Sequence, residues 1–131
     1  MMDNRAIYRI CSKLLDVYRP AYRNLNRVIA RVYSSVTSSF RFESATNKNM
    51  REMLANMVPF QAFNFLVTAY SPLIPVDRMC FSGFSVDELT QNMFEDWCLM
   101  VKCKLKYGKY MACSLMYMGD VVTRDINNVI R

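Results

Sequence analysis

An α/β fold built around one long helix is the architecture that the sequence predicts. The 131 residues are 53% hydrophobic and 21% charged, a composition typical of one domain with a buried core rather than of a disordered chain. Apolar residues recur at three- and four-residue steps over residues 20–41, as on one face of a helix. Two shorter apolar runs, residues 63–70 and 110–117, are typical of buried strands.

The N-terminal residues predict a first helix over residues 4–15. Asp3 and Asn4 are both of the residue types that cap a helix N-terminus. Apolar residues at helical spacing then form one stripe: Ile7, Ile10 or Cys11, and Leu14. We expect this stripe to face the core.

A longer helix is predicted from Pro20 to about Arg41, because proline favours the first turn of a helix. Its apolar face recurs at helical steps and consists of Tyr22, Leu25, Ile29, Val32, Val36 and Phe40. At a rise of 1.5 Å per residue, the helix should be roughly 30 Å long. Because that length crosses a whole domain, we expect it to be the central helix of the fold.

Three shorter helices are predicted from capping signals in the remaining sequence. Asn49 and Glu52 have the spacing of a capping box, and so do Ser85 and Glu88. Thr123 is suited to cap a last helix. With the two strands included, the predicted order is helix, long helix, helix, strand, helix, strand, helix.

The run of residues 110–117 raises the question of whether Cys113 is reactive or buried. Both faces of this predicted strand are largely apolar, which is typical of a strand covered on both sides. A cysteine in such a strand behaves as a small hydrophobic residue, and the sequence offers no base to activate it. We therefore expect Cys113 to lie in the interior. Two strands are too few for a self-sufficient sheet, so the chain should hold only part of one.

Several kinds of site are excluded by composition. The sequence has no histidine, which excludes the usual zinc sites and histidine-based catalysis, and we expect no metal site. Its five cysteines are odd in number and include no CxxC pair, so we expect reduced thiols. The apolar segment 58–76 is interrupted by polar residues and prolines, which argues against a membrane span.

The chain is basic, with a net charge of +6. Arginines recur every four residues at Arg19, Arg23, Arg27 and Arg31, and four lysines lie within residues 102–109. Such arrays bind phosphate backbones or acidic partners. A run of charge is more often a solvated face, so a basic module for acidic partners or RNA is the alternative function, and nucleic acid is the less favoured partner.

Several segments of the chain closely resemble segments of alpha-tubulins. They are GKYMACSLMYMGDVV, AIYRIC, YRNLNRVI, SSVTSSFRF, NMVPF and MVKC. The resemblance covers essentially the whole chain, although NMVPF and ELTQNMF look closer to beta-tubulin. It implies a partial tubulin fold. Residues 1–42 would form the end of the nucleotide-binding domain and the central core helix, and residues 43–131 a partial intermediate domain, with a fragment of its mixed sheet and flanking helices.

The resemblance also implies a nucleotide site. Tubulins hold the guanine of GTP with two asparagines and a stacked tyrosine, and Asn4, Asn26 and Tyr22 match these positions. An amide offers both a donor and an acceptor to a guanine edge, and Tyr22 and Asn26 lie one helical turn apart. The residues alone leave another interpretation open, in which Asn4 only caps a helix and Tyr22 only packs in the core.

A catalytic residue is implied by the same resemblance. Glu52 matches the alpha-tubulin glutamate that acts on GTP held by the beta subunit, where a carboxylate orients or activates the attacking water. The nearby loop departs from the family pattern at Ser44, Lys48 and Asn49. Of these, Ser44 replaces a glycine, whose backbone freedom a serine lacks.

The implied function is that of a structural constituent of cytoplasmic microtubules, with beta-tubulin as partner and GTP as cofactor. The glycine-rich phosphate loop of tubulins has no counterpart among the three glycines of this chain. We therefore expect the isolated chain neither to bind nor to hydrolyse GTP by itself. Residues 75–85 match the lateral-contact loop but depart from its sequence, so lateral contact is not carried over. Besides the basic module, a second alternative to the microtubule role is that the chain is a non-functional fragment.

Overall fold

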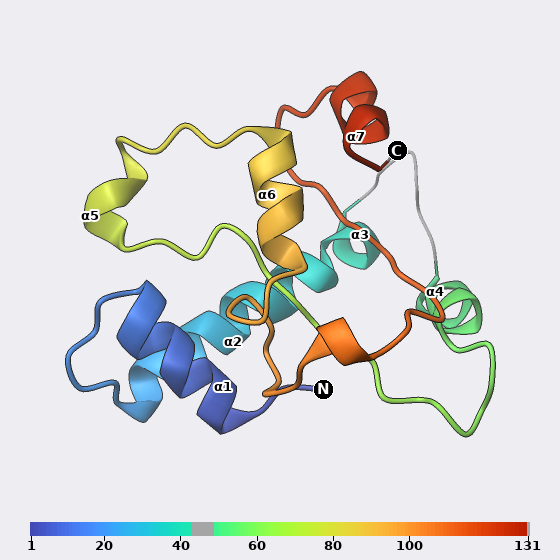
Figure 1. The fold of residues 1–131 in the computed structure, drawn as a ribbon, viewed down its shortest axis with the longest axis horizontal. Helices are drawn as coiled ribbons and strands as arrows, with labels where there is room; N and C mark the ends of the chain where they lie inside the picture. Colours follow the sequence, from blue (N-terminus) through green and yellow to red (C-terminus); the bar gives the residue numbers. More distant parts are fainter. Residues whose placement is uncertain (43–48, 131) are drawn as a thin grey trace.

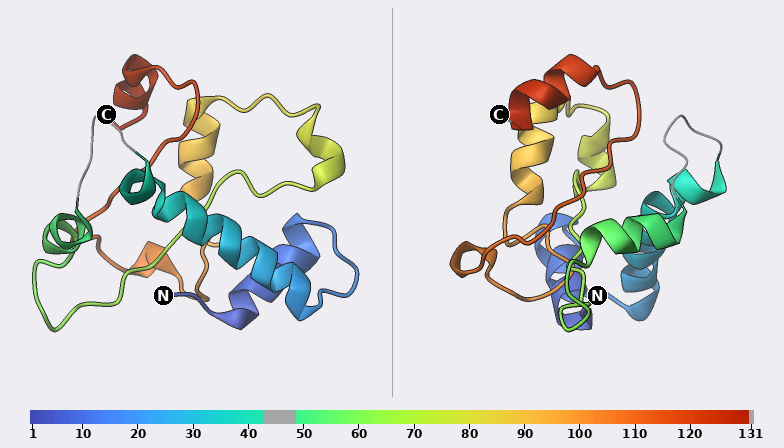
Figure 2. Two further views of the ribbon diagram at one scale, coloured as in Figure 1. Left: turned by 180° about the vertical axis from the view of Figure 1, so that it is seen from behind. Right: turned by 90° about the vertical axis from the view of Figure 1, so that its right-hand side faces the viewer.

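The computed structural model describes residues 1–42 and 49–130, and Figure 1 shows their arrangement. The helices in chain order are α1 (Asn4–Arg9), a π-helical turn (Ile10–Leu14), α2 (Tyr22–Val36), α3 (Ser38–Arg41), α4 (Met50–Met57), α5 (Val76–Met79), α6 (Val86–Met93), a 3-10 turn (Leu105–Tyr107) and α7 (Thr123–Ile130). Helices α1 and α2 cross at the lower left of Figure 1, and α6 and α7 pack together at the top; Figure 2 shows both pairs from two further sides. Among the described residues, no helix has the length and apolar character to cross a bilayer.

The core is the contact of α1 and its π-helical extension with α2. Its buried members are spaced at helical steps and joined by one residue from later in the chain: Ile7, Ile10, Cys11, Leu25, Val28, Val32 and Met100. Side chains three or four residues apart share one face of a helix, so two such faces bury each other. The predicted first helix and its apolar stripe are therefore confirmed.

The long predicted helix is confirmed in position but divides at Thr37. The Thr37 hydroxyl donates to the carbonyl oxygen of Tyr33 over 2.8 Å, and α3 then continues to Arg41. A threonine that bonds to the carbonyl four residues back competes with the regular helix and bends it. Tyr22 is 78% exposed, so its prediction as a core-facing residue is wrong. It stands in the first turn of α2, at the rim of the contact with α1.

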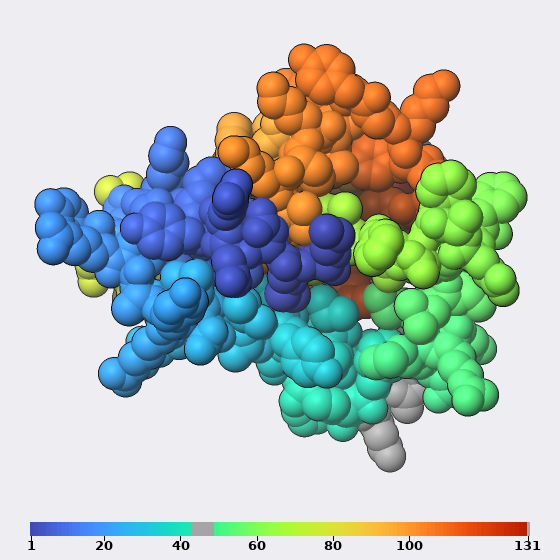
Figure 3. All heavy atoms as spheres, turned by 90° about the horizontal axis from the view of Figure 1, so that it is seen from below, coloured from blue at the N-terminus to red at the C-terminus, as the bar shows by residue number. Residues whose placement is uncertain are grey.

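Backbone hydrogen bonds tie the N-terminus to two distant segments. The Asp3 N–H donates to the Met100 carbonyl over 2.8 Å, and the Met100 N–H donates to the Thr68 carbonyl over 2.9 Å. The Tyr70 N–H donates to the Cys98 carbonyl over 3.3 Å. Figure 3 shows the N-terminal segment (blue) between α2 (cyan) and the residues that follow α6 (orange). These bonds bring both segments over the core.

The two predicted strands are not formed within the described residues. At the expected strand over residues 63–70, the structure has one isolated antiparallel bridge between Ala69 and Leu99. Residues 110–117 have no regular structure, and Cys113, predicted to be interior, is exposed. A strand needs neighbours to pair its backbone groups, and the described part of the chain supplies none to this segment. The α/β prediction is therefore corrected to a helical fold, and the sheet fragment is not confirmed.

Helix α6 begins with the predicted capping box. The Glu88 N–H donates to the Ser85 hydroxyl over 3.2 Å, and the Ser85 N–H donates to the Glu88 carboxylate over 3.3 Å. The buried Thr90 hydroxyl shares a 2.7 Å hydrogen bond with the Tyr117 hydroxyl, which fastens the segment around Tyr117 to α6. Asn49 stands at the N-cap position of α4, but its side chain makes no capping bond to any described residue, so that predicted box is not formed.

The five cysteines are free thiols that differ in burial. Two are buried and three reach the surface: Cys11 and Cys98, then Cys80, Cys103 and Cys113. Burial raises the pKa of the Cys11 thiol. Burial, together with the nearby Glu95 carboxylate, raises the pKa of Cys98 to about 11. Because the thiolate is the reactive form, the buried thiols should be inert near neutral pH.

We expect iodoacetamide to modify Cys113 near neutral pH and to leave Cys98 unmodified, as measured by peptide mass spectrometry. The pKa of Cys98 is raised on folding, so its thiolate is scarce until the pH approaches about 11. The neutral Cys98 thiol therefore stabilises the folded chain fully below the ordinary thiol pKa. This stabilisation is lost as the pH rises through the pKa that Cys98 has in the folded chain. In the urea-unfolded chain, the control, both thiols should react at similar rates. Equal rates in the native chain would contradict the described burial of Cys98.

The core contact predicts that Val32→Ala lowers the free energy of unfolding by about 2 kcal/mol. Val32 is fully buried, and removal of its methyl groups costs transfer free energy and leaves a cavity. Urea titration followed by far-UV circular dichroism measures the change. The control is Tyr33→Ala, an exposed neighbour on the same helix, which should shift the free energy by about 0.5 kcal/mol or less. Equal midpoints for the two variants would show that this packing is not the core.

Candidate functional site

A hollow of about 580 Å³ lies where the start of α1 meets the start of α2. Its lining combines amide, cationic, aromatic and apolar side chains: Asn4, Arg5, Tyr8, Pro20, Ala21, Tyr22 and Leu25. Local hydrogen bonds set both helix starts. The Asp3 carboxylate accepts from the Arg5 N–H over 3.2 Å, and the Ala21 N–H donates to the Asn24 side-chain oxygen over 3.1 Å. We name this hollow the Asn4–Tyr22 pocket.

Two of the three residues predicted to hold guanine line this pocket. Asp3 is the N-cap of α1, so the interpretation of Asn4 as only a cap is wrong. Tyr22 is exposed, so its interpretation as only a core residue is wrong as well. Asn26 is exposed on α2, one turn from Tyr22, and is not among the residues that line the pocket. The structure therefore brings Asn4 and Tyr22 together and leaves Asn26 outside.

The chemistry of the pocket suits a flat, polar aromatic ligand. Two tyrosines, Tyr8 and Tyr22, supply rings on which such a ligand can stack. The Asn4 amide offers a donor and an acceptor, and Arg5 adds a positive charge.

As for metals, the part of the chain that the structure describes has no cluster of three or more His, Cys, Asp or Glu side chains that could hold a metal ion.

Arg5 and Tyr8 are pocket residues that the sequence interpretation missed. Tyr8 follows Asn4 by four residues, a spacing that makes side chains neighbours on a helix, so the sequence did contain a signal for it. Arg5 carried no such signal, because a charged residue in the first turn of a helix is usually solvated. The tertiary contact of α1 with α2 alone places Arg5 beside Tyr22 in one hollow.

Glu52 lies in the first turn of α4, and its side chain is exposed. A carboxylate in this position interacts favourably with the helix dipole. Helices α4 and α1 lie apart in Figures 1 and 2, and Glu52 does not line the Asn4–Tyr22 pocket. Of the nearby positions that depart from the family pattern, Ser44 and Lys48 lie outside the described residues, and Asn49 immediately precedes α4.

The arginines predicted to form a basic face are exposed. They are Arg19, before α2, and Arg23, Arg27 and Arg31 along it. The Arg19 guanidinium lies over the Tyr18 ring, 5.5 Å from its centroid. Within residues 1–42 and 49–130, the one ion pair joins Arg78 and Asp16 at 3.6 Å. The basic face of α2 is therefore directed to solvent in the described structure.

Comparison with known proteins identifies the family. The family described as "Tubulin C-terminal domain" matches residues 62–131. The chain is 45% identical over 130 residues to the tubulin alpha-2 chain of Eleusine indica, and equally to the tubulin alpha-1B and alpha-2B chains of Physarum polycephalum. These alignments cover 99% of this chain and 29% of each relative, so the chain spans less than a third of the length of the curated relatives it matches. Because the matched domain extends over more than half of the chain, this protein belongs to the tubulin family, as its resemblance to alpha-tubulins implied.

Proposed function

We propose that this chain is an alpha-tubulin-like structural component of cytoplasmic microtubules and that it pairs with beta-tubulin. The observation that carries the proposal is its 45% identity to alpha-tubulin chains along 99% of its length. Exposed apolar side chains such as Phe63, Phe65 and Phe81 add support. Exposed apolar surface of this kind is typical of proteins that associate with partners.

The Asn4–Tyr22 pocket is the proposed site for the guanine of GTP. Its amide can pair with the polar edge of a purine, and its tyrosine can stack on the purine face. Asn26, one turn along α2 from Tyr22, is the third member of the proposed set. No glycine lines this pocket, so it supplies contacts to the base rather than a phosphate-binding loop. We therefore propose that GTP is held only after the chain has joined a tubulin partner.

Glu52 is the proposed catalytic residue, and it would act on GTP bound to a neighbouring subunit. Its exposure on α4, away from the Asn4–Tyr22 pocket, supports action across a subunit contact rather than within this chain. A carboxylate can orient a water molecule or accept its proton. In this proposal, the isolated chain does not hydrolyse GTP.

When the chain is mixed with tubulin heterodimers and GTP under polymerising conditions, we expect it to sediment with microtubules in a saturable ratio. Quantitative gel analysis of pellet and supernatant measures the ratio, because the chain's mass of 15.4 kDa separates it on the gel from the longer tubulin chains. A chain with a net charge of +6 can also bind acidic polymers through charge alone, and such binding is lost at higher salt.

The matched control for this assay removes three positive charges from α2 through the combined substitutions Arg23→Gln, Arg27→Gln and Arg31→Gln. All three side chains are exposed, so the variant should fold as the original chain does. Specific pairing predicts that the variant still sediments at moderate salt. If the original chain no longer sediments at moderate salt, and the variant does not sediment either, the tubulin-like role is contradicted and the basic-module alternative is favoured.

In the sedimented polymer, we expect a photoreactive GTP analogue with its reactive group on the base to label this chain. Tyr22→Ala should reduce labelling about fivefold or more, because base–aromatic stacking contributes roughly 1–3 kcal/mol. Asn4→Ala should also reduce it, and Tyr33→Ala, an exposed tyrosine of the same helix outside the pocket, should not. If the original chain and all variants sediment and are labelled equally, this pocket is not the site of the base.

A further inference from the structure

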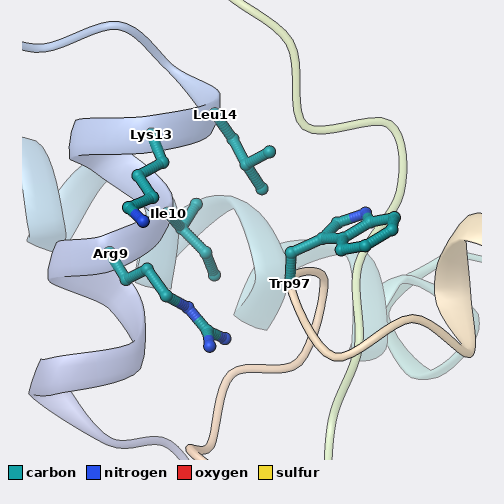
Figure 4. Close-up of a pocket in the computed structure, with 5 residues that line it drawn as sticks. All are labelled: Arg9, Ile10, Lys13, Leu14 and Trp97. Atoms are coloured by element: carbon teal, nitrogen blue, oxygen red, sulfur yellow. The ribbon is translucent and has the colours of Figure 1, made fainter.

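A second pocket, of about 230 Å³, lies between the end of the first helical segment and Trp97. Five residues line it: Arg9, Ile10, Lys13, Leu14 and Trp97. Figure 4 shows Ile10 and Leu14 directed from the helix toward the indole ring, with Arg9 reaching out beside them. It has no lining residue in common with the Asn4–Tyr22 pocket. We name it the Trp97 pocket.

The Trp97 pocket has an apolar floor and an apolar wall. Ile10 is completely buried in the core, and Leu14 is half-buried against it. Trp97 is 48% exposed, although an indole is one of the largest apolar groups that a protein can bury. A ligand with an apolar tail would therefore cover surface on Leu14 and the indole that is now in contact with water.

Positive charge lies at the same pocket. Arg9 and Lys13 are one helical turn apart, so their side chains share one side of the helix. One terminal Arg9 nitrogen, Nη2, donates to the backbone carbonyl of Asp96 over 2.7 Å. The Arg9 Nε is buried and has no hydrogen-bond partner among the described residues. A partly buried guanidinium that meets only a neutral carbonyl is stabilised further by an anion nearby.

Among the residues that the structure describes, no acidic side chain forms an ion pair with this charge. Glu95 and Asp96 are the nearest acids in sequence to Trp97, and neither forms an ion pair with Arg9 or Lys13. Within the ranges that the structure describes, the one ion pair is elsewhere, between Arg78 and Asp16. The Trp97 pocket thus combines uncovered apolar surface with two cations that lack an acidic partner in the described structure.

We propose that the Trp97 pocket binds a small amphipathic anion, an aliphatic monocarboxylate of medium chain length. Its tail would lie against Leu14 and Trp97, and its carboxylate would lie beside Arg9 and Lys13. The volume argues for a small ligand, because about 230 Å³ is below the roughly 300–1,000 Å³ of pockets for drug-sized ligands. This site is independent of the proposed role in microtubules.

Trp97 is the only tryptophan of the chain, so its fluorescence reports directly on the pocket. Titration of the full 131-residue chain with hexanoate should produce a saturable change in emission. Butyrate should bind about fifteenfold more weakly, because each buried methylene contributes about fourfold in affinity. 1-Hexanol, which has the same tail length without the charge, should also bind more weakly than hexanoate. An unsaturable response to hexanoate, or equal affinity for hexanoate and 1-hexanol, would overturn the proposal.

A pair of matched variants tests the role of charge. Lys13 is exposed, so Lys13→Gln should leave the fold intact and weaken hexanoate binding about two- to fivefold, as expected for a partly solvated ion pair. Lys106→Gln removes another exposed lysine, outside the pocket, and should leave the affinity unchanged. Far-UV circular dichroism confirms that both variants keep the fold. If both variants bind hexanoate as the original chain does, Lys13 does not recognise the anion and this assignment is wrong.

Discussion

The packing of α1 against α2 is the contact on which the rest of the described structure depends. Ile7 and Ile10 on one side, with Val28 and Val32 on the other, remove a continuous apolar face from water. Met100 completes this contact, and its backbone is bonded both to the N-terminal segment and to the segment around residue 68. The same contact therefore positions parts of the chain that are far apart in sequence.

Both candidate pockets lie at the edges of this contact. The Asn4–Tyr22 pocket is at the start of the two helices, and the Trp97 pocket is beside the π-helical turn. Their chemistries differ: the first combines two tyrosines and an amide, and the second combines aliphatic and indole surface with two cations. Because rigid helices carry most of the lining residues, the contact that forms the core also holds each set of side chains together.

Away from this contact, the described structure buries little apolar surface. Phe63 and Phe65 are exposed, as are Met111 and Met118 in the segment that follows the 3-10 turn. The hydroxyl pair of Thr90 and Tyr117 is a local attachment rather than a second core. A segment that is apolar on both faces is covered only when other strands or helices pack on both sides of it. In this tubulin-family chain, the helical N-terminal half holds the packed core, and the strand-like segments remain largely uncovered.

The sequence by itself determined the local features, because they depend on spacing along a few neighbouring residues. Helical periodicity identified the buried stripe of α1 and the course of α2 and α3, and the Ser85–Glu88 pair identified the start of α6. The family resemblance gave the tubulin assignment. Only the tertiary structure decided where each segment packs. It leaves Tyr22 and Cys113 exposed, and it joins Asn4 with Tyr22 and Arg9 with Trp97. Strand pairing and pocket formation depend on groups distant in sequence, whose contacts no local pattern specifies.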